Sequence, residues 1–250
     1  MVTQAIVPLA GLGTRLLPLS SLIPKELLPI NGKPNLEYIM EECIQAGIKQ
    51  FIFVVPKNRP IIKNYFFNDK FYKKILKKKK KDKRIKDIFK RLKRYQKMIK
   101  FVYQNKPEGT GHAIMQCEKF LKGSHFLMLL ADDLIVKKNC SKEMIVLHRK
   151  TKGSVIATKK VDRKTVSRWG ILGFKNKKKN SFLINEVIEK PKLSEAPSNY
   201  AIIGRYILPK KIMKEIKMLK PGQGKEIHIT DAIKNLIYKN ENFYGNIFKG

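Results

Sequence analysis

The order of three apolar segments near the start of the chain constrains the fold most strongly. Thr3 to Leu9 and Gln50 to Val55 are short apolar runs that are typical of buried strands. Between them, Leu36 to Ala46 has helical spacing and is followed by Gly47, a residue that often ends helices. Strand, helix and strand in this order form a parallel unit with a crossover helix. The sequence therefore predicts an α/β protein.

Further apolar runs predict more strands along the chain. They are Ile99 to Tyr103, His125 to Leu130, Ser154 to Lys159, Gly170 to Phe174, Asn185 to Ile188 and Tyr200 to Leu208. Thr230 to Lys239 is predicted to be a helix that Thr230 caps. Because no repeat and no clean linker interrupts the interior, we expect residues 1–250 to form a single domain.

One segment, Lys70 to Lys100, is far more basic than the rest and holds 17 lysines and arginines against two aspartates. Its apolar residues recur at intervals of three and four, which predicts one face of a helix with lysines on the other. Those residues are Ile85, Ile88, Phe89, Leu92 and Tyr95. We interpret the segment as a solvated helical insertion at about 70–100, with a specific polyanion site as the alternative.

The net charge of +34 raises the question of a nucleic-acid partner. Of the 54 basic residues 45 are lysine and nine are arginine, and they are spread over the whole chain. Such a composition is typical of a chain encoded by AT-rich DNA, which accounts for the many lysines. No zinc finger, RGG run or RNP-type aromatic pattern accompanies them. No specific nucleic-acid partner is predicted, although weak, salt-sensitive association with polyanions is expected.

Cysteine content and hydropathy bear on the compartment. Cys43, Cys117 and Cys140 are odd in number and show no CxxC spacing, so buried thiols in a reducing cytoplasm are expected. No stretch reaches the ~18 apolar residues of a membrane helix. Met1 to Pro8 has no basic flank and resembles a first strand more than a signal peptide.

The turn after the first predicted strand is the first candidate site. Gly11 and Gly13 allow backbone N–H groups to approach a phosphate closely. The spacing is not that of a dinucleotide-binding turn, because Leu16 stands where the third glycine belongs, and no P-loop Gly-Lys-Ser/Thr follows. Arg15 could clamp phosphate oxygens and Lys25 could add a second charge. An ordinary strand-to-helix turn is the alternative.

Three later segments of the chain contain further candidate ligand-binding residues. Asp132 follows an apolar strand, where a carboxylate can hold Mg²⁺ with phosphate oxygens, although Asp132 and Asp133 could equally cap a loop. His112 lies in a glycine-rich turn, where a structural role is favoured and that of a base is the alternative. Glu189 and Lys190 place an acceptor beside a cation.

Seven motifs in fixed order resemble one family. They are AGLGTRLLP, IPKELLPINGKP, EGTGHA, LLADD, EVIEKPK, PSNYAIIGRY and GQGKEIHITDAI. In this order they resemble bacterial UTP–glucose-1-phosphate uridylyltransferases (UDP-glucose pyrophosphorylases) of the sugar nucleotidyltransferase family, from Ala5 to about Gly250. The turn AGLG favours this family over the related thymidylyltransferases, whose turn usually begins with two glycines.

The resemblance implies a Rossmann-like nucleotidyltransferase fold with a mixed, mostly parallel central sheet and helices on both faces. It also implies catalytic roles for Arg15 and Lys25 on the triphosphate and a Mg²⁺ ligand at Asp132. Implied nucleotide-binding residues are Ala10, Gly11, Gly13, Glu26, Gln104 and Gly109, and implied sugar-phosphate residues are Gly170, Glu189, Lys190 and Gly204. The implied reaction is in-line attack by glucose 1-phosphate on the α-phosphorus of UTP, with loss of pyrophosphate.

The chain also departs from the family pattern. Ser21 replaces a usual Lys, Glu37 a usual Gln, Trp169 a usual Tyr and His228 a usual Gln. The family's Asp-Cys-Gly segment, expected to supply a second Mg²⁺ ligand, does not follow Gly250, and neither do the helices that contribute to oligomer contacts. We therefore expect a fragment or a naturally shortened protein, with reduced activity or a higher Mg²⁺ requirement.

Three other functions stay open at this point. One is transfer of thymidylyl or another nucleotidyl group to a sugar 1-phosphate. Another is a catalytically impaired remnant that only binds nucleotide. The third is a basic nucleic-acid binder. A homo-oligomer is implied by the family, but the helices that would form it are not in the sequence.

Overall fold

A computed structural model describes residues 1–222 and 226–248 of the chain. The middle of the GQGKE motif, residues 223–225, and the last two residues lie outside the described part. The main strands are β1 (Gln4–Pro8), β4 (Gln50–Pro56), β5 (Ile99–Gln104), β6 (His125–Leu129), β7 (Ser154–Lys160), β8 (Gly170–Lys175), β9 (Ser181–Glu189), β10 (Tyr200–Pro209) and β11 (Phe243–Ile247). A small hairpin consists of β2 (Pro29–Ile30) and β3 (Lys33–Pro34).

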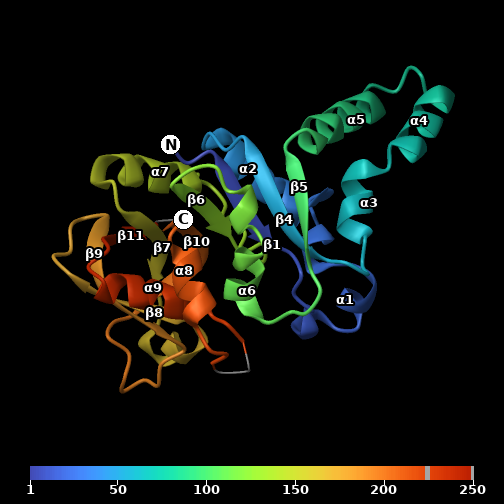
Figure 1. Ribbon diagram of the computed structural model, residues 1–250. Coiled ribbons are helices and arrows are strands. Elements are labelled where there is room, and N and C mark those ends of the chain that lie inside the picture. Colours follow the sequence, from blue (N-terminus) through green and yellow to red (C-terminus); the bar gives the residue numbers. More distant parts are fainter. Residues whose placement is uncertain (223–225, 249–250) are drawn as a thin grey trace.

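The helices lie between these strands in the order expected of an α/β chain. They are α1 (Leu19–Leu22), α2 (Asn35–Gln45), α3 (Ile61–Phe67), α4 (Asp69–Lys78), α5 (Lys83–Gln96), α6 (Gly109–Met115), α7 (Cys140–Thr151), α8 (Ile212–Met218) and α9 (Ile229–Tyr238). Figure 1 shows α3, α4 and α5 projecting from one end of the molecule.

The main strands form one sheet in the order β5-β4-β1-β6-β10-β7-β11-β9-β8. The strands β5, β4, β1 and β6 are mutually parallel, as the predicted strand, helix and strand unit requires. Among the strands that the structure describes in this sheet, β9 and β10 run against the others. The predicted mixed, mostly parallel sheet is therefore confirmed.

Side chains of the central strands alternate between two hydrophobic cores, one on each face of the sheet. Ala5 and Val7 of β1 and Phe53 of β4 pack with apolar residues of α2, α3, α5 and α7. Ile6 and Ile52 point the other way and pack with α6, α8 and α9. Because both faces are covered, these strands are apolar throughout. Each fully buried isoleucine or phenylalanine stabilises the fold by roughly 1.5–3 kcal/mol.

The lysine-rich segment contains two helices and not one. The predicted apolar face belongs to α5, in which Leu92 and Tyr95 are buried, and Phe89 stacks on Tyr72 of α4 with ring centroids 6.0 Å apart. The two helices are separated at residues 79–82, where Asp82 accepts a hydrogen bond from the backbone N–H of Ile85 and caps α5. The segment's last two residues, 99 and 100, lie in β5.

A buried acidic residue on α2 attaches this projecting region to the body. Glu37 is fully buried, accepts a hydrogen bond from Tyr65 of α3, and lies 2.8 Å from Arg91 of α5. The side chain of Arg91 is 37% exposed, and its charge compensates the fully buried carboxylate, an ion pair that a neutral amide at position 37 could not form. The departure from the family's usual Gln at Glu37 therefore has a structural reason.

Two local predictions were wrong. Thr230 does not cap α9: the cap residue is His228, and Thr230 lies inside the first turn, where its hydroxyl donates to Glu189. The strand predicted from Asn185 begins at Ser181, and its first four residues pair with β11, a strand that was not predicted from the sequence. The helices α7 and α8 were missed as well.

The three cysteines are free and buried. Among the described residues no helix is long and apolar enough to cross a membrane.

Candidate active site

The carboxyl ends of β1, β4, β5 and β6 meet at one edge of the sheet, because these strands are parallel. In open α/β sheets this edge is where ligands bind. The glycine-containing turn, residues 10–15, follows β1, Gln104 ends β5, and Asp132 follows β6. The first three sequence-predicted elements of the nucleotide site therefore share this edge.

Lys25 and Asp132 form an ion pair across this edge. Lys25 Nζ lies 2.7 Å from Asp132 Oδ2, although 107 residues separate them in sequence. Burial by itself would raise the pKa of Asp132, but the hydrogen bond and charge of Lys25, with a smaller effect of Arg15, hold it below its ordinary value. Both side chains keep solvent access, at 25% and 50% exposed. The structure thus places an ionised carboxylate and two cations together where ligands can reach them.

Glu26, the neighbour of Lys25, is buried and only 2% exposed. Burial raises the pKa of Glu26 to about 7, and the charge of Asp132 adds to the increase while Lys25 and Arg59 oppose it. At pH 7 about half of the Glu26 carboxyls are therefore neutral, so this group repels a phosphate chain less than an ordinary carboxylate would. Its burial also fixes the backbone beside Lys25.

The two glycines of the first turn differ in what surrounds them. Gly13 has φ +65°, and a Cβ built there would lie 3.1 Å from Cβ of Ser20, whose hydroxyl donates to the Gly13 carbonyl. At Gly11, a Cβ would meet nothing within 4 Å. Gly13 is therefore required by the turn itself, whereas Gly11 leaves open space next to the buried Ala10.

Arg59, which sequence reasoning missed, holds the segment before Lys25. Its Nη2 donates to the backbone carbonyls of Ser20 and Ser21, at 2.5 and 2.9 Å. Arg59 follows β4, so the bond joins two loops at the ligand-binding edge. No motif marked this arginine, because its partners are backbone carbonyls that any sequence provides.

His112 bridges two amides. Its ring nitrogens lie 2.9 Å from the side-chain amides of Gln104 and of Gln116. Gln104 is 4% exposed, so the ring fixes the orientation of an almost buried amide. This arrangement favours the structural interpretation of His112 over that of a base.

The glycines of EGTGHA allow another segment to pack closely. Gly109 has φ +95°, and a Cβ built there would lie 2.7 Å from the backbone oxygen of Ile227. Gly111 donates its backbone N–H to the same oxygen at 2.8 Å. Gly109, predicted to pack close to the base, packs directly against Ile227, which brings the start of α9 next to α6.

The predicted sugar-phosphate residues lie at the other half of the sheet. Gly170 pairs with Glu189 across β8 and β9, and a Cβ at Gly170 would lie 3.1 Å from Glu189 Oε2. The Thr230 hydroxyl donates to the same oxygen at 3.2 Å. Gly204 has φ +62°, and a Cβ there would lie 2.3 Å from Asp133 Oδ2. Two glycines thus make room for two carboxylates.

Tyr206 connects the two halves. Its ring is buried on β10, and burial, followed by the charges of Glu189, Asp133 and Asp132, raises the pKa of its hydroxyl. The charges of carboxylates from both halves therefore act on one phenol. Burial and the charge of Asp132 also raise the pKa of Asp133, so the two neighbouring aspartates are unlike electrostatically.

Arg205, also missed from the sequence, lies behind this cluster and is fully buried. Its Nη2 lies 2.9 Å from Glu42 Oε2, and Glu42 in turn accepts a hydrogen bond from the hydroxyl of Ser141 at 2.6 Å. The guanidinium partly opposes the raised pKa of Asp133. By contrast Lys190 is exposed, has φ +46°, and donates its backbone N–H to Trp169.

Residues 4–250 match the model of the family described as nucleotidyl transferase. The chain belongs to the nucleotidyl transferase family. Members of this family generally use a divalent cation, which is consistent with a carboxylate at the phosphate-binding edge.

This nucleotidyl transferase is similar to proteins named for one reaction. It is 39% identical over 238 residues to UTP–glucose-1-phosphate uridylyltransferase 2 of Staphylococcus saprophyticus, covering 94% of this chain and 81% of the relative. A UDP-glucose pyrophosphorylase complexed with UDP-glucose superimposes with TM-score 0.84 at 32% identity, covering 100% of this chain and 92% of the other. A UTP-bound enzyme from Acinetobacter baumannii gives TM-score 0.84 at 30% identity, with 100% and 87% covered.

Proposed function

We propose that this nucleotidyl transferase joins UTP to glucose 1-phosphate, giving UDP-glucose and pyrophosphate. The observation that carries the proposal is the Lys25–Asp132 pair at 2.7 Å beside the open space at Gly11. It provides a cation for phosphate oxygens and a carboxylate for a metal at the edge where a nucleotide binds. The relatives named above supply the identity of base and sugar.

In the proposed reaction, a phosphate oxygen of glucose 1-phosphate attacks the α-phosphorus of UTP. A new P–O bond forms, the bond from the α-phosphorus to the bridging oxygen of pyrophosphate breaks, and pyrophosphate leaves with the electron pair. The nucleophile is already an anion, so no base is required. Arg15 and Lys25 lower the repulsion between two anionic reactants and stabilise charge in the transition state.

Asp132 would hold Mg²⁺. Mg²⁺ prefers one or two carboxylates together with phosphate oxygens and water, and Asp132 is ionised and half exposed. The described part of the chain contains no cluster of three or more acidic, histidine or cysteine side chains that could hold a metal alone. The remaining ligands would therefore come from the triphosphate and water, and the cation would supply charge neutralisation.

The other residues position the substrates. Gln104 and the backbone at Ala10 and Gly11 would contact the base, and the contact with His112 and the open space at Gly11 support these roles. Glu189, oriented by Thr230, accepts hydrogen bonds from sugar hydroxyls, and Gly170 and Gly204 keep that region open. Lys190 is free to turn toward the sugar phosphate, because it is exposed beside Glu189.

The test is pyrophosphate release by the 250-residue chain with Mg²⁺, glucose 1-phosphate and either UTP or dTTP. We expect release that requires the sugar phosphate and is much faster with UTP. Faster release with dTTP would instead indicate a thymidylyltransferase. UTP binding without release would indicate a nucleotide-binding protein that does not catalyse the reaction.

A further inference from the structure

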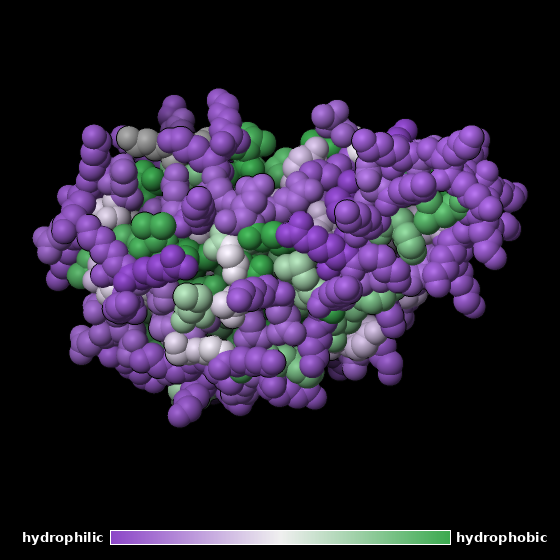
Figure 2. All heavy atoms as spheres, turned by 90° about the horizontal axis from the view of Figure 1, so that it is seen from above, coloured by the Kyte–Doolittle hydropathy of each residue, from purple (hydrophilic) through white to green (hydrophobic). Residues whose placement is uncertain are grey.

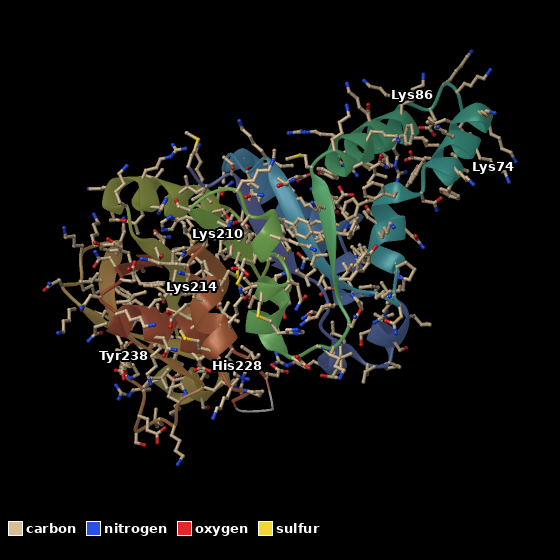
Figure 3. All side chains as sticks on the ribbon, in the orientation of Figure 1. Lys74, Lys86, Lys210, Lys214, His228 and Tyr238 are labelled. Atoms are coloured by element: carbon tan, nitrogen blue, oxygen red, sulfur yellow. The ribbon has the colours of Figure 1, made fainter. Side chains whose placement is uncertain are left out.

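The projecting pair of helices carries a disproportionate part of the protein's charge. Residues 69–97, here called the basic arm, comprise α4, the connecting turn and α5. They contain 16 lysines and arginines against three aspartates, a net charge of +13 out of +34 for the whole chain. In Figure 1 the basic arm extends away from the sheet, and in Figure 3 Lys74 and Lys86 lie on its outer side.

Few of these cations are neutralised within the protein. Among the described residues, the ion pairs of the basic arm are Lys93 with Asp69 and Arg91 with Glu37. Asp82 already serves as the cap of α5. Most of the positive charge therefore faces solvent without a carboxylate partner.

The cations of α5 form a regular stripe. Five of them recur at intervals of three and four residues and are exposed: Lys83, Lys86, Lys90, Arg94 and Lys97. In an α-helix this spacing puts them on one face, with about 4.5–6 Å of rise between neighbours. Such a row fits a ligand that carries negative charges at regular intervals along its length.

The apolar face of the basic arm is already used. Leu92 and Tyr95 are buried in the core, and Phe89 stacks on Tyr72. The one strongly exposed apolar residue among those described in the arm is Phe71, at its base. Figure 2 shows mainly hydrophilic atoms over the outer surface at this end. Membrane binding by amphipathic helices needs a free apolar face, so a phosphate backbone in water is the better fit.

A hollow of about 490 Å³ lies on the flank of α5 that faces the β2–β3 hairpin. Its lining includes the cations Lys33, Lys83, Arg84 and Arg91 and one carboxylate, Asp87. Lys33 and Arg91 have acidic partners, but Lys83 and Arg84 have none among the described residues. The hollow therefore offers a concave place for a phosphate next to the convex stripe.

We propose that the basic arm binds the phosphodiester backbone of nucleic acid without reading its bases. The arm has few arginines and no exposed aromatic row for stacking, so base recognition is not expected. The proposal concerns a surface outside the candidate active site and is independent of the reaction proposed above.

The experiment measures binding of fluorescent 20-base-pair DNA, 20-base-pair RNA and single-stranded DNA, each of mixed sequence, over a range of salt concentrations. The arm variant is Lys83→Gln with Lys86→Gln and Lys90→Gln. The matched control removes three exposed lysines from the β8–β9 turn, Lys175→Gln with Lys178→Gln and Lys179→Gln. Both variants lose the same charge, and unchanged circular dichroism and thermal unfolding verify their folds.

We expect the arm variant to weaken duplex binding at least ~10-fold and to lower the slope of log K against log salt by about 3, with little change in the control. If the unmodified chain binds one duplex more tightly than the other, and this binding depends on the arm, the result would support the proposal and identify DNA or RNA as the preferred partner. Equal losses in both variants would overturn the proposal, since net charge alone would then explain binding. Arm-dependent binding to phosphatidylserine vesicles but not to oligonucleotides would also overturn it.

Discussion

The two halves of the candidate active site, which we propose bind the nucleotide and the sugar phosphate, are built by different means. Next to β1 and β6, charged side chains from distant segments pair directly, as Lys25 does with Asp132. Next to β8, β9 and β10, glycines leave room for carboxylates, as Gly204 does for Asp133 and Gly170 for Glu189. We therefore expect the proposed nucleotide half to depend mainly on charge and the proposed sugar half mainly on shape.

The largest effect is expected from removing a charge in the nucleotide half. Lys25→Ala and Asp132→Asn should each lower turnover at least ~100-fold, on the scale of one lost electrostatic contact to the transition state. Steady-state pyrophosphate release measures this. Lys33→Ala, which breaks the lysine–carboxylate pair with Glu41 outside the site, should keep normal turnover. Near-normal turnover of either site variant would refute the role of that residue.

The buried Glu26 should make stability depend on pH. Its pKa is raised from 4.5 to about 7, so between these values the folded protein keeps a proton that the unfolded chain has lost. Stability contributed by this group is therefore complete below pH 4.5 and falls by about 3 kcal/mol as pH rises through 7. Urea unfolding of Glu26→Gln should lack this decrease, whereas the exposed Glu195→Gln should keep it. Parallel pH profiles for Glu26→Gln and the unmodified chain would show that Glu26 titrates normally.

The shape of the sugar half can be tested with Gly204→Ala. The added methyl group would meet Asp133 at 2.3 Å and Leu130 at 3.1 Å on a backbone with φ +62°. We expect a loss of about 2 kcal/mol in unfolding free energy from strain and crowding together. Gly32→Ala shares a positive φ, +74°, but meets nothing within 4 Å, so it should cost only the backbone strain. Equal losses in the two variants would mean that Asp133 moves aside freely.

The smallest effect is expected from Thr230→Val, which removes the hydrogen bond to Glu189. This hydrogen bond, which orients Glu189, contributes about 1 kcal/mol. Its loss should raise KM for glucose 1-phosphate roughly 5-fold, while KM for UTP and kcat stay close to normal. Thr165→Val, whose hydroxyl donates to Asp162 away from the site, is the control. A parallel rise in KM for UTP would place Thr230 in a general structural role.

The central strands, such as β1 and β4, were predictable from the sequence because burial on both faces makes them continuous apolar runs, whereas β11 was missed. The phosphate-binding turn was visible for a similar reason: glycines are required at specific backbone conformations, as at Gly13. The split of the lysine-rich segment into α4 and α5 was not visible, because residues 79–82 contain no glycine or proline to mark it.

The candidate site was less predictable than the fold. Arg59 and Arg205 act through backbone carbonyls and a buried carboxylate, and such partners leave no local pattern. The partners of His112 are close in sequence, Gln104 eight residues before it and Gln116 four residues after it, but the motif did not show which groups its ring nitrogens contact. A residue whose partner is distant in sequence can be noticed, but its role cannot be assigned from spacing.

The sequence by itself determined the class of the fold, the parallel direction of its first two main strands, and the chemistry of the residues offered to a ligand. Hydrophobic periodicity and glycine placement are local properties, so they can be read along the chain. Only the tertiary structure decided that Lys25 meets Asp132, that Glu37 receives Arg91, and that the basic arm stands apart. These outcomes depend on sheet order and packing, which bring together residues that the sequence keeps far apart.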